Sequence, residues 1–296
     1  DLRPAEWFHA AREYPHFRPD VKTYTQAIRQ ARQAATDRSG NPGFDAPWTV
    51  QGPGNIGARV NAIKVHPTNP NIIYIGYSQG GVWKTTNGGQ SWAPIFDDQP
   101  FLAIGDIELD PQNPNIVYVG TGDLNIGGYP FIGDGVWKSL DGGQSWQHLG
   151  LENQRIISKI IIHPTSPNTI YAAAMGLPFE RNSHRGLYKT TNGGLSWQKV
   201  LHISDSTGVI DLIMSPANPQ VLYAAAWDRI RNNQESIVSG PNARVWKTTD
   251  GGANWTKLGG GLPEDEQSRV GLAIDAQNPQ RVLAMYAGTS LNFNGI

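Results

Sequence analysis

Short runs of alternating apolar and polar residues fill most of this chain, and Gly, Pro and Asn separate them. In the first repeat, residues 60–65 alternate in polarity, 71–77 are rich in Ile and Tyr, 81–85 carry a Trp, and 91–96 follow a Gly-rich turn. Alternation over four to eight residues, bounded by turn formers, is typical of a half-buried strand. The pattern therefore predicts four short strands in each repeat of about 50 residues.

An eight-residue turn follows the third predicted strand of each complete repeat. Its copies begin at Thr85, Ser139, Thr190 and Thr248, and their final Trp residues lie 51 to 58 residues apart. The third position is Asn or Asp, which bonds the nearby backbone, and the two Gly residues after it tolerate a positive φ. We assign structural roles in this Asp-box to Asn87, Trp92, Asp141, Trp146, Asn192, Trp197, Asp250 and Trp255.

A second turn, built around Pro, precedes the second predicted strand. It begins at His66 and recurs near residues 110, 163, 215 and 275, so the chain has five of these turns and four Asp-boxes. Four-stranded units repeated radially predict an all-β fold, a β-propeller of four complete blades and a partial fifth. Because an open blade edge exposes backbone groups, we expect further blades of the same polypeptide, or a partner chain, to close the ring.

The N-terminal residues differ from the repeats. Residues 20–38 place Tyr24, Ile28 and Ala31 on one helical face, and a Gly- and Pro-containing stretch follows. We predict a short helical N-terminal extension over residues 1–45 and propeller blades over 46–296, with 48–50 as an outer strand.

Composition removes several classes of function. The chain has 24 basic and 25 acidic residues, which gives no electrostatic reason to expect a nucleic-acid partner. It has no Cys, so a disulfide scaffold and a thiolate metal site are excluded. No apolar run approaches the ~20 residues of a membrane span. His66 and His163 stand where other copies of the turn have Asp or Ser, so we expect no metal and no cofactor.

The motifs at residues 52–61 (GPGNIGARVN), 80–84 (GGVWK), 133–139 (GDGVWKS) and 185–190 (RGLYKT) carry a family resemblance. With the Asp-boxes they resemble the Asp-box (BNR-repeat) propellers, and more closely the bacterial sortilin/VPS10-like secreted proteins, over residues 46–296. The resemblance implies an extracellular or cell-surface protein secreted by a bacterium. Asp-boxes occur in sialidases, xyloglucanases and non-enzymes alike, so the fold does not decide the function.

Two enzyme classes within this resemblance have recognisable motifs. Sialidases carry Arg-Ile-Pro, which is absent from this sequence. Xyloglucanase-type glycoside hydrolases place a catalytic acid before a Gly pair, and here Ser78 stands at that position, before Gly80. Ser lacks the required carboxylate, so we assign no catalytic residue and favour a protein that is not an enzyme. If it is an enzyme, we expect a glycoside hydrolase.

Binding is expected on the loops that follow strands two and four, because these share the face opposite the Pro turns and Asp-boxes and vary between repeats. Acids beside aromatic rings suit sugar stacking and hydrogen bonding, and a Trp beside charged residues suits a protein contact. For each candidate the alternative is a structural role in a turn or loop. The candidates are Asp123, Tyr129, Phe131, Asp134, His184, Arg185, Trp227, Asp228 and Arg229.

Three hypotheses of function follow. The main one is a secreted or cell-surface binding or scaffolding propeller that recognises a protein, peptide or glycan through the variable loops. The first alternative is an Asp-box glycoside hydrolase, xyloglucanase- or sialidase-like, and the second is a subunit of an extracellular assembly. Arg59 and Asn61 are expected either to face the central channel or, as we favour, to pair with Asp106 of the next inner strand.

Overall fold

The computed structural model describes residues 21–37, 58–128, 130–289 and 293–295. The chain divides into two compact units, Asp1–Gly57 and Ala58–Ile296. In the first unit, α2 (Val21–Asp37) is an α-helix, which confirms the predicted N-terminal helix. The predicted outer strand at 48–50 lies outside the described residues.

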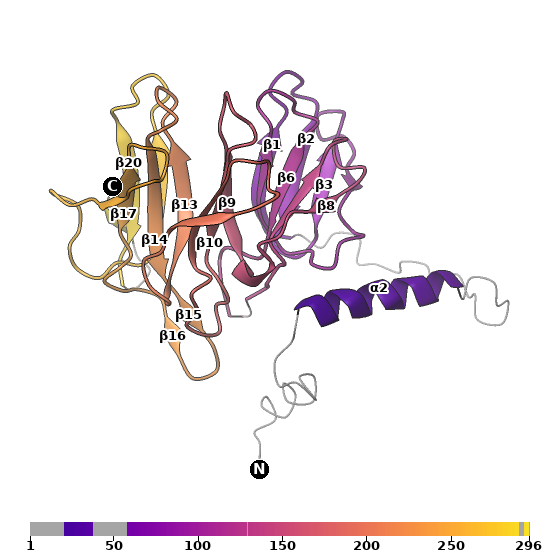
Figure 1. Ribbon diagram of the computed structural model, residues 1–296, viewed down its shortest axis with the longest axis horizontal. Coiled ribbons are helices and arrows are strands. Elements are labelled where there is room, and N and C mark those ends of the chain that lie inside the picture. The colour runs from indigo at the N-terminus through magenta and orange to yellow at the C-terminus, as the bar shows by residue number, and fades with distance from the viewer. Residues whose placement is uncertain (1–20, 38–57, 129, 290–292, 296) are drawn as a thin grey trace, which may run out of the picture. The chain divides into compact units, whose positions relative to one another are not determined.

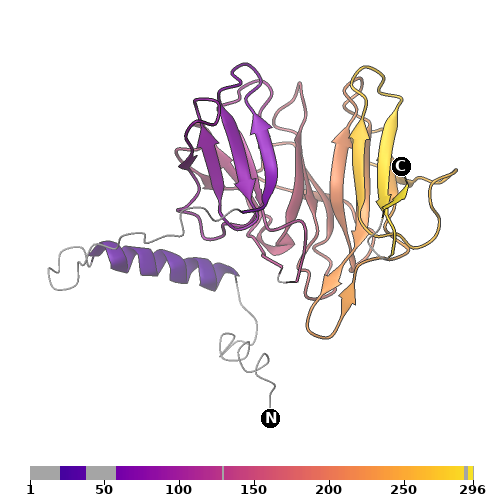
Figure 2. The same cartoon turned by 180° about the vertical axis from the view of Figure 1, so that it is seen from behind.

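The second unit contains one antiparallel sheet for each sequence repeat (Figure 1, Figure 2). The first blade consists of β1 (Val60–Val65), β2 (Ile73–Tyr77), β3 (Val82–Thr85) and β4 (Ala93–Pro94). The second consists of β5 (Ile104–Leu109), β6 (Val117–Thr121), β7 (Val136–Ser139) and β8 (Gln147–His148), and a short 3-10 helix, Glu152–Gln154, follows it.

The third blade consists of β9 (Ile157–Ile162), β10 (Ile170–Ala174), β11 (Gly186–Thr190) and β12 (Gln198–Leu201). The fourth consists of β13 (Thr207–Met214), β14 (Leu222–Asp228), β17 (Val245–Thr248) and β18 (Thr256–Lys257). Between β14 and β17 it carries a small hairpin of β15 (Ile230–Arg231) and β16 (Ser236–Ile237). The described part of the fifth consists of β19 (Val270–Ile274), β20 (Val282–Ala287) and β21 (Phe293–Gly295).

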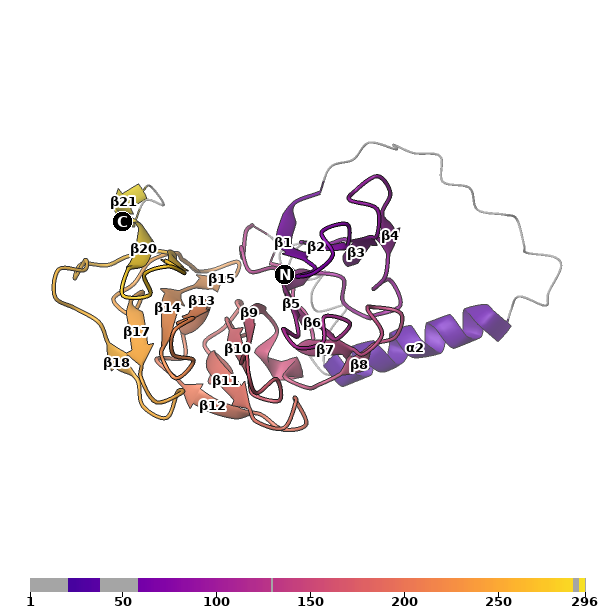
Figure 3. The ribbon, with the colours of Figure 1, turned by 90° about the horizontal axis from the view of Figure 1, so that it is seen from above.

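The blades follow one another in an arc, with the first strands on its inner side and β4, β8, β12 and β18 on its outer side (Figure 3). This radial arrangement is that of a β-propeller. The predicted fold, four four-stranded blades and a partial fifth, is confirmed. Apolar side chains remain exposed on the two outermost sheets: Ile63 on β1 is 63% exposed and Met285 on β20 is 55% exposed.

The two repeated turns meet as the sequence predicts. In the first Asp-box, Thr85 Oγ1 donates to Asn87 Oδ1 at 2.8 Å, and Gly88 adopts a φ of 69°. The backbone N of Gly88 donates to the carbonyl oxygen of Asn71, in the Pro turn, at 3.0 Å. The Asp-box and the Pro turn of a blade therefore share one face, and the loops after strands two and four lie on the other.

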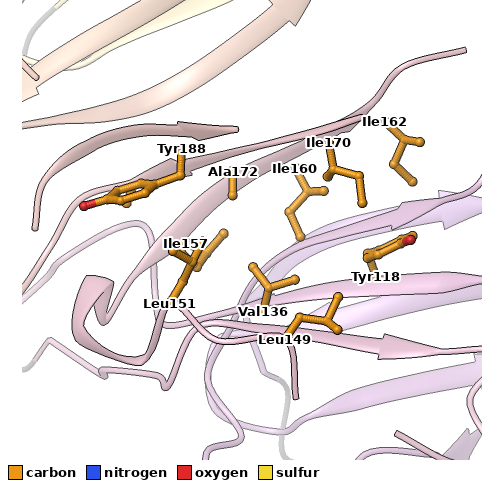
Figure 4. Packing of buried hydrophobic residues seen from close by; sticks show 11 residues of the cluster. Tyr118, Val136, Leu149, Leu151, Ile157, Ile160, Ile162, Ile170, Ala172 and Tyr188 are labelled. Atoms are coloured by element: carbon orange, nitrogen blue, oxygen red, sulfur yellow. The ribbon is translucent and has the colours of Figure 1, made fainter. Parts of the chain in front are cut away.

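The hydrophobic core lies between blades. At the boundary of the second and third blades, Ile157 and Ile160 of β9 pack with Val136 of β7 and with Leu149 and Tyr118 (Figure 4). The inner strands are also joined by polar side chains that bond the backbone of the next inner strand. These bonds run from Asn61 to Ile104 O (2.8 Å), from Ile160 N to Asp106 (2.8 Å), from Ser158 to Val209 O (2.6 Å) and from Leu272 N to Asp211 (2.9 Å).

Candidate functional site

The variable loops of three neighbouring blades form one surface, which we call the loop face. It consists of residues 122–128 and 130–135 of the second blade, 175–185 of the third and 229–244 of the fourth. Variable loops held on a rigid scaffold are where propellers and other folds carry their binding sites.

Contacts between these loops hold the face together. Backbone N of Arg231 donates to the carbonyl oxygen of Pro178 at 2.7 Å. Arg181 donates two parallel hydrogen bonds to the carboxylate of Glu235, at 2.8 and 2.7 Å. A bidentate guanidinium–carboxylate pair fixes orientation as well as distance. The loops of the third and fourth blades therefore form a single braced surface.

The second-blade loop crosses the inner side of the arc. Ile126 is fully buried and packs with Met175 and Trp227, from the third and fourth blades. Its backbone φ of 43° is unusual for a β-branched residue, and its carbonyl oxygen accepts a hydrogen bond from Arg229 at 2.5 Å. Arg269, which precedes β19, donates to Asn125 Oδ1 at 2.8 Å. One loop thus connects blades two, four and five.

Asp123 begins this loop and is 2% exposed. It pairs with Arg59, and it accepts a hydrogen bond from Asn61 Nδ2 at 3.0 Å. The expected pairing of Arg59 and Asn61 with Asp106 is therefore wrong. The β-bulge between Ile104 and Asp106 directs Asp106 toward the third blade, where it meets Lys159 and the backbone of Ile160.

The other two acids predicted to bind a ligand are buried and bonded to the protein. Asp134 Oδ1 accepts from Trp137 Nε1 at 2.9 Å, and Asp228 accepts from the backbone N of Asn242 at 2.8 Å. Burial raises the pKa of Asp134, against the lowering effects of Trp137 and of nearby positive charge from His148. Each acid therefore has at least one hydrogen-bond partner within its own blade.

The predicted Arg and Trp residues are buried as well. Arg185 donates to the carbonyl oxygen of Leu177 at 2.8 Å, and Trp227 Nε1 donates to that of Val238 at 2.9 Å. The Arg229 guanidinium lies 5.5 Å from the Trp227 ring and donates to the carbonyl oxygen of Ile237 at 2.8 Å. Burial lowers the pKa of both Arg185 and Arg229 to about 10. These side chains fasten loops, and a ligand-binding role for them stays a prediction.

Among the remaining candidates, Phe131 is 37% exposed and His184 is also exposed. Tyr129 lies outside the described residues. The structure adds Phe179, 39% exposed on the third-blade loop, which the sequence reasoning missed. The sequence could have indicated Phe179, since it is an aromatic residue in a variable loop, as Phe131 is.

Arg155, in the connection between β8 and β9, was also missed. It is 7% exposed, has a positive φ of 58°, and its guanidinium lies 5.5 Å from the centre of the Phe101 ring. Nη1 is buried with no hydrogen-bond partner among the described residues. Burial lowers the pKa of Arg155 to about 10, partly offset by the charge of Asp134. A single Arg in an irregular connection gives no sequence signal.

Residues 134–269 match the family model of sortilin, the neurotensin receptor 3 family. That stretch holds β7 and β8 of the second blade, the whole third and fourth blades, and three of the Asp-boxes. The chain is a sortilin-like Asp-box β-propeller. Among the described residues, no helix is long and apolar enough to cross a membrane, and no group of three or more His, Cys, Asp and Glu side chains is placed to hold a metal ion.

The propeller is also similar to glycoside hydrolases. A xyloglucanase from Paenibacillus sp is 21% identical over an alignment that covers 72% of this chain and 22% of that enzyme. The crystal structure of an ancestral GH74 enzyme matches with 26% identity and a TM-score of 0.62, covering 79% of this chain and 30% of the enzyme. The GH74 enzyme of Niastella koreensis matches with 19% identity and a TM-score of 0.52, over 81% of this chain and 37% of that one.

The propeller thus spans between a fifth and two fifths of the length of these relatives. Ser78 follows β2 and is buried, and its backbone N donates to the carbonyl oxygen of Arg59 at 2.9 Å. A Ser hydroxyl in this position supplies hydrogen bonding and no carboxylate chemistry.

Proposed function

We propose that this propeller is part of a glycoside-hydrolase-type protein that acts on a glucan such as xyloglucan and holds the polysaccharide on its loop face. The observation that carries the proposal is the 26% identity and TM-score of 0.62 to an ancestral GH74 enzyme over 79% of this chain. The Paenibacillus xyloglucanase supports the same class of substrate. An extracellular or cell-surface location suits such a substrate, and fractionation of the producing cells tests it.

The chemistry of the loop face agrees with a neutral sugar chain. Phe131 and Phe179 expose aromatic rings on two adjacent loops, and aromatic faces stack well on the apolar faces of sugar rings. The nearby charges of Arg181 and Glu235 are paired with each other, which leaves little net charge to attract an ion. Braced loops also lose little conformational entropy when a ligand binds.

Ser78 favours a second candidate, a propeller that binds without cleaving. At this position the xyloglucanase resemblance implies a catalytic carboxylate, and Ser cannot act as the acid or base of glycoside hydrolysis. In that case the loop face binds a glycan, protein or peptide as a scaffold.

One experiment separates these functions. The purified chain is run through gels with and without xyloglucan, with mannan as the control polysaccharide, and release of reducing ends is measured in parallel. Retarded migration with release supports the hydrolase, and retardation without release supports the binding propeller. Migration unchanged by xyloglucan and by an unbranched β-glucan overturns the proposal of a glucan ligand.

Substitutions of exposed residues test whether the polysaccharide binds on the loop face. Phe131→Ala and Phe179→Ala should each reduce retardation, because each removes an exposed ring from the loop face. Leu195→Ala is the matched control, since Leu195 is 79% exposed in an Asp-box on the opposite face. Equal retardation of all three variants and the wild type would place the polysaccharide elsewhere.

A further inference from the structure

The guanidinium of Arg155 is a buried cation with an unused hydrogen-bond donor. Its Nη1 is shielded from solvent and has no hydrogen-bond partner among the described residues. A buried polar group without a partner costs free energy, and a buried charge costs more. Arg185 and Arg229 also have buried nitrogens without partners, but each guanidinium is fixed by donation to backbone carbonyl oxygens.

The surroundings of Arg155 supply a matching acceptor and an aromatic ring. Asp134 follows Gly133, whose backbone N is bonded to the carbonyl oxygen of Arg155, and its charge acts on the guanidinium although the two side chains form no ion pair. Asp134 Oδ1 is bonded to Trp137 and, at 3.3 Å, to Thr121, while no described residue donates to Oδ2. The half-buried ring of Phe101 covers the guanidinium.

The loop face is joined to this point. Gly133, next to Asp134, donates from its backbone N to the carbonyl oxygen of Arg155 at 2.6 Å, so the second-blade loop is fixed against the connection that holds Arg155. Phe131, with its exposed ring, stands two residues before Gly133. A donor, an acceptor and the Phe101 ring therefore lie at the boundary of the second and third blades, and the loop that carries Phe131 is fixed to the same connection.

We propose that Arg155 and Asp134 form a sugar-hydroxyl subsite covered by Phe101. A sugar hydroxyl accepts one hydrogen bond and donates another, so it satisfies an Arg N–H and a carboxylate at once. The proposal rests on the proposed function and names a specific point of contact for a neutral sugar of the bound polysaccharide. Phe101 swings away from the guanidinium to admit the sugar, and its ring or that of Phe131 stacks on it.

The test compares Arg155→Met and Asp134→Asn with the wild type by calorimetric titration with xyloglucan oligosaccharides. Both variants keep the size of the side chain, and each should weaken binding at least tenfold. Arg281→Met, at an exposed position in a Pro turn, should bind as the wild type does. If the wild type binds and both variants bind equally well, the subsite is overturned while the proposed function stands.

A second measurement tests the subsite even if the wild-type protein does not bind glucan oligosaccharides. The Nε–H signal of Arg155, assigned by its loss in Arg155→Met, is followed by NMR while glucose, xylose, galactose and cellobiose are added. A saturable shift with any of them supports the subsite even if the proposed function has failed. If none of the four sugars shifts the signal, the Arg155 donor binds water at most, and the subsite is overturned. Thermal unfolding of Arg155→Met adds a check, because a solely structural Arg155 would lower Tm without changing Kd.

Discussion

Lys189 donates a hydrogen bond from Nζ to the carbonyl oxygen of Gly251 at 2.7 Å and joins β11 of the third blade to the Asp-box of the fourth. The same Nζ lies 5.3 Å from the centre of the Tyr171 ring, whose hydroxyl donates to the same oxygen at 2.9 Å. Lys84 makes the equivalent bond to Gly142 at 2.9 Å, between the first and second blades. The Asp-box is therefore a joint between blades as well as a turn within one.

We expect Lys189→Met to lower the free energy of unfolding by about 1 to 2 kcal/mol, since it removes a charged hydrogen bond and a cation–π contact. Tyr171→Phe should cost about 1 kcal/mol. Burial, with the charge of Asp250 adding to it, raises the pKa of Tyr171 to about 12, so the phenol keeps its proton in ordinary buffers. Urea denaturation measures both, and exposed Lys257→Met serves as the control. An effect of Lys257→Met as large as that of Lys189→Met would contradict the joint.

Gly105 on β5 marks a point where blades two and three approach too closely for a side chain. A Cβ there would lie 2.0 Å from the carbonyl oxygen of Ile157 and 2.8 Å from that of Gly122. Gly105→Ala should destabilise the protein by about 3 kcal/mol, because backbone must move to admit the methyl group. Gly127→Ala is the control, since a Cβ there has no atom within 4 Å. Thermal unfolding that fails to separate the two variants would argue against this packing.

Most of the fold was predictable from the sequence because its strands and turns depend on short-range patterns of residues. The strands, the Asp-boxes and the Pro turns depend on residues close together in the chain, and the repetition of these patterns gave four blades and part of a fifth. The path of residues 123–128 across the arc was not predictable, because their partners Arg229 and Arg269 lie about 100 or more positions away in the chain. The mistaken pairing with Asp106 arose from a β-bulge, which shifts the register without a sequence mark.

Candidate residues were harder to interpret than the fold. Polar and aromatic residues in variable loops attract attention whether they bind a ligand or fasten the loop, and Arg185 and Asp228 have protein partners that only the structure reveals. Arg155 was overlooked because an unused hydrogen-bond donor can be recognised only once its surroundings are known.

Acid should weaken the fourth Asp-box. Hydrogen bonds from Asn254 and Thr248 hold the pKa of Asp250 at about 2, below its ordinary value of 3.8. The native state therefore binds fewer protons than the unfolded chain in this range, so the stabilisation is complete above about pH 4 and is lost as pH falls through about 2. Asp250→Asn should remove this part of the pH dependence, which urea midpoints between pH 2 and 5 measure. Exposed Glu266→Gln is the control, and an unchanged acid slope in Asp250→Asn would refute the assignment.

The bond between Asn125 and Arg269 should couple the second-blade loop to the fifth blade. Arg269 Nη1 donates to Asn125 Oδ1 at 2.8 Å, and Asn125 Nδ2 donates to Asn61 at 3.0 Å, so one amide ties blades one, two and five. In a double-mutant cycle of Asn125→Ala and Arg269→Met we expect a coupling of about 1 to 2 kcal/mol. Either single variant should also speed hydrogen exchange in β19 and β20, because the fifth blade loses its tie to the loop.

The exposed pair Arg281–Asp275, with 3.8 Å between its charged atoms, is the control cycle and should give a coupling near zero. A coupling between Asn125 and Arg269 no larger than this, with exchange in β19 and β20 unchanged, would mean that the loop contacts the fifth blade without holding it. A large coupling confined to the first pair would instead identify residues 123–128 as the segment that fixes the curvature of the arc, and with it the spacing of the loops on which we place the sugar.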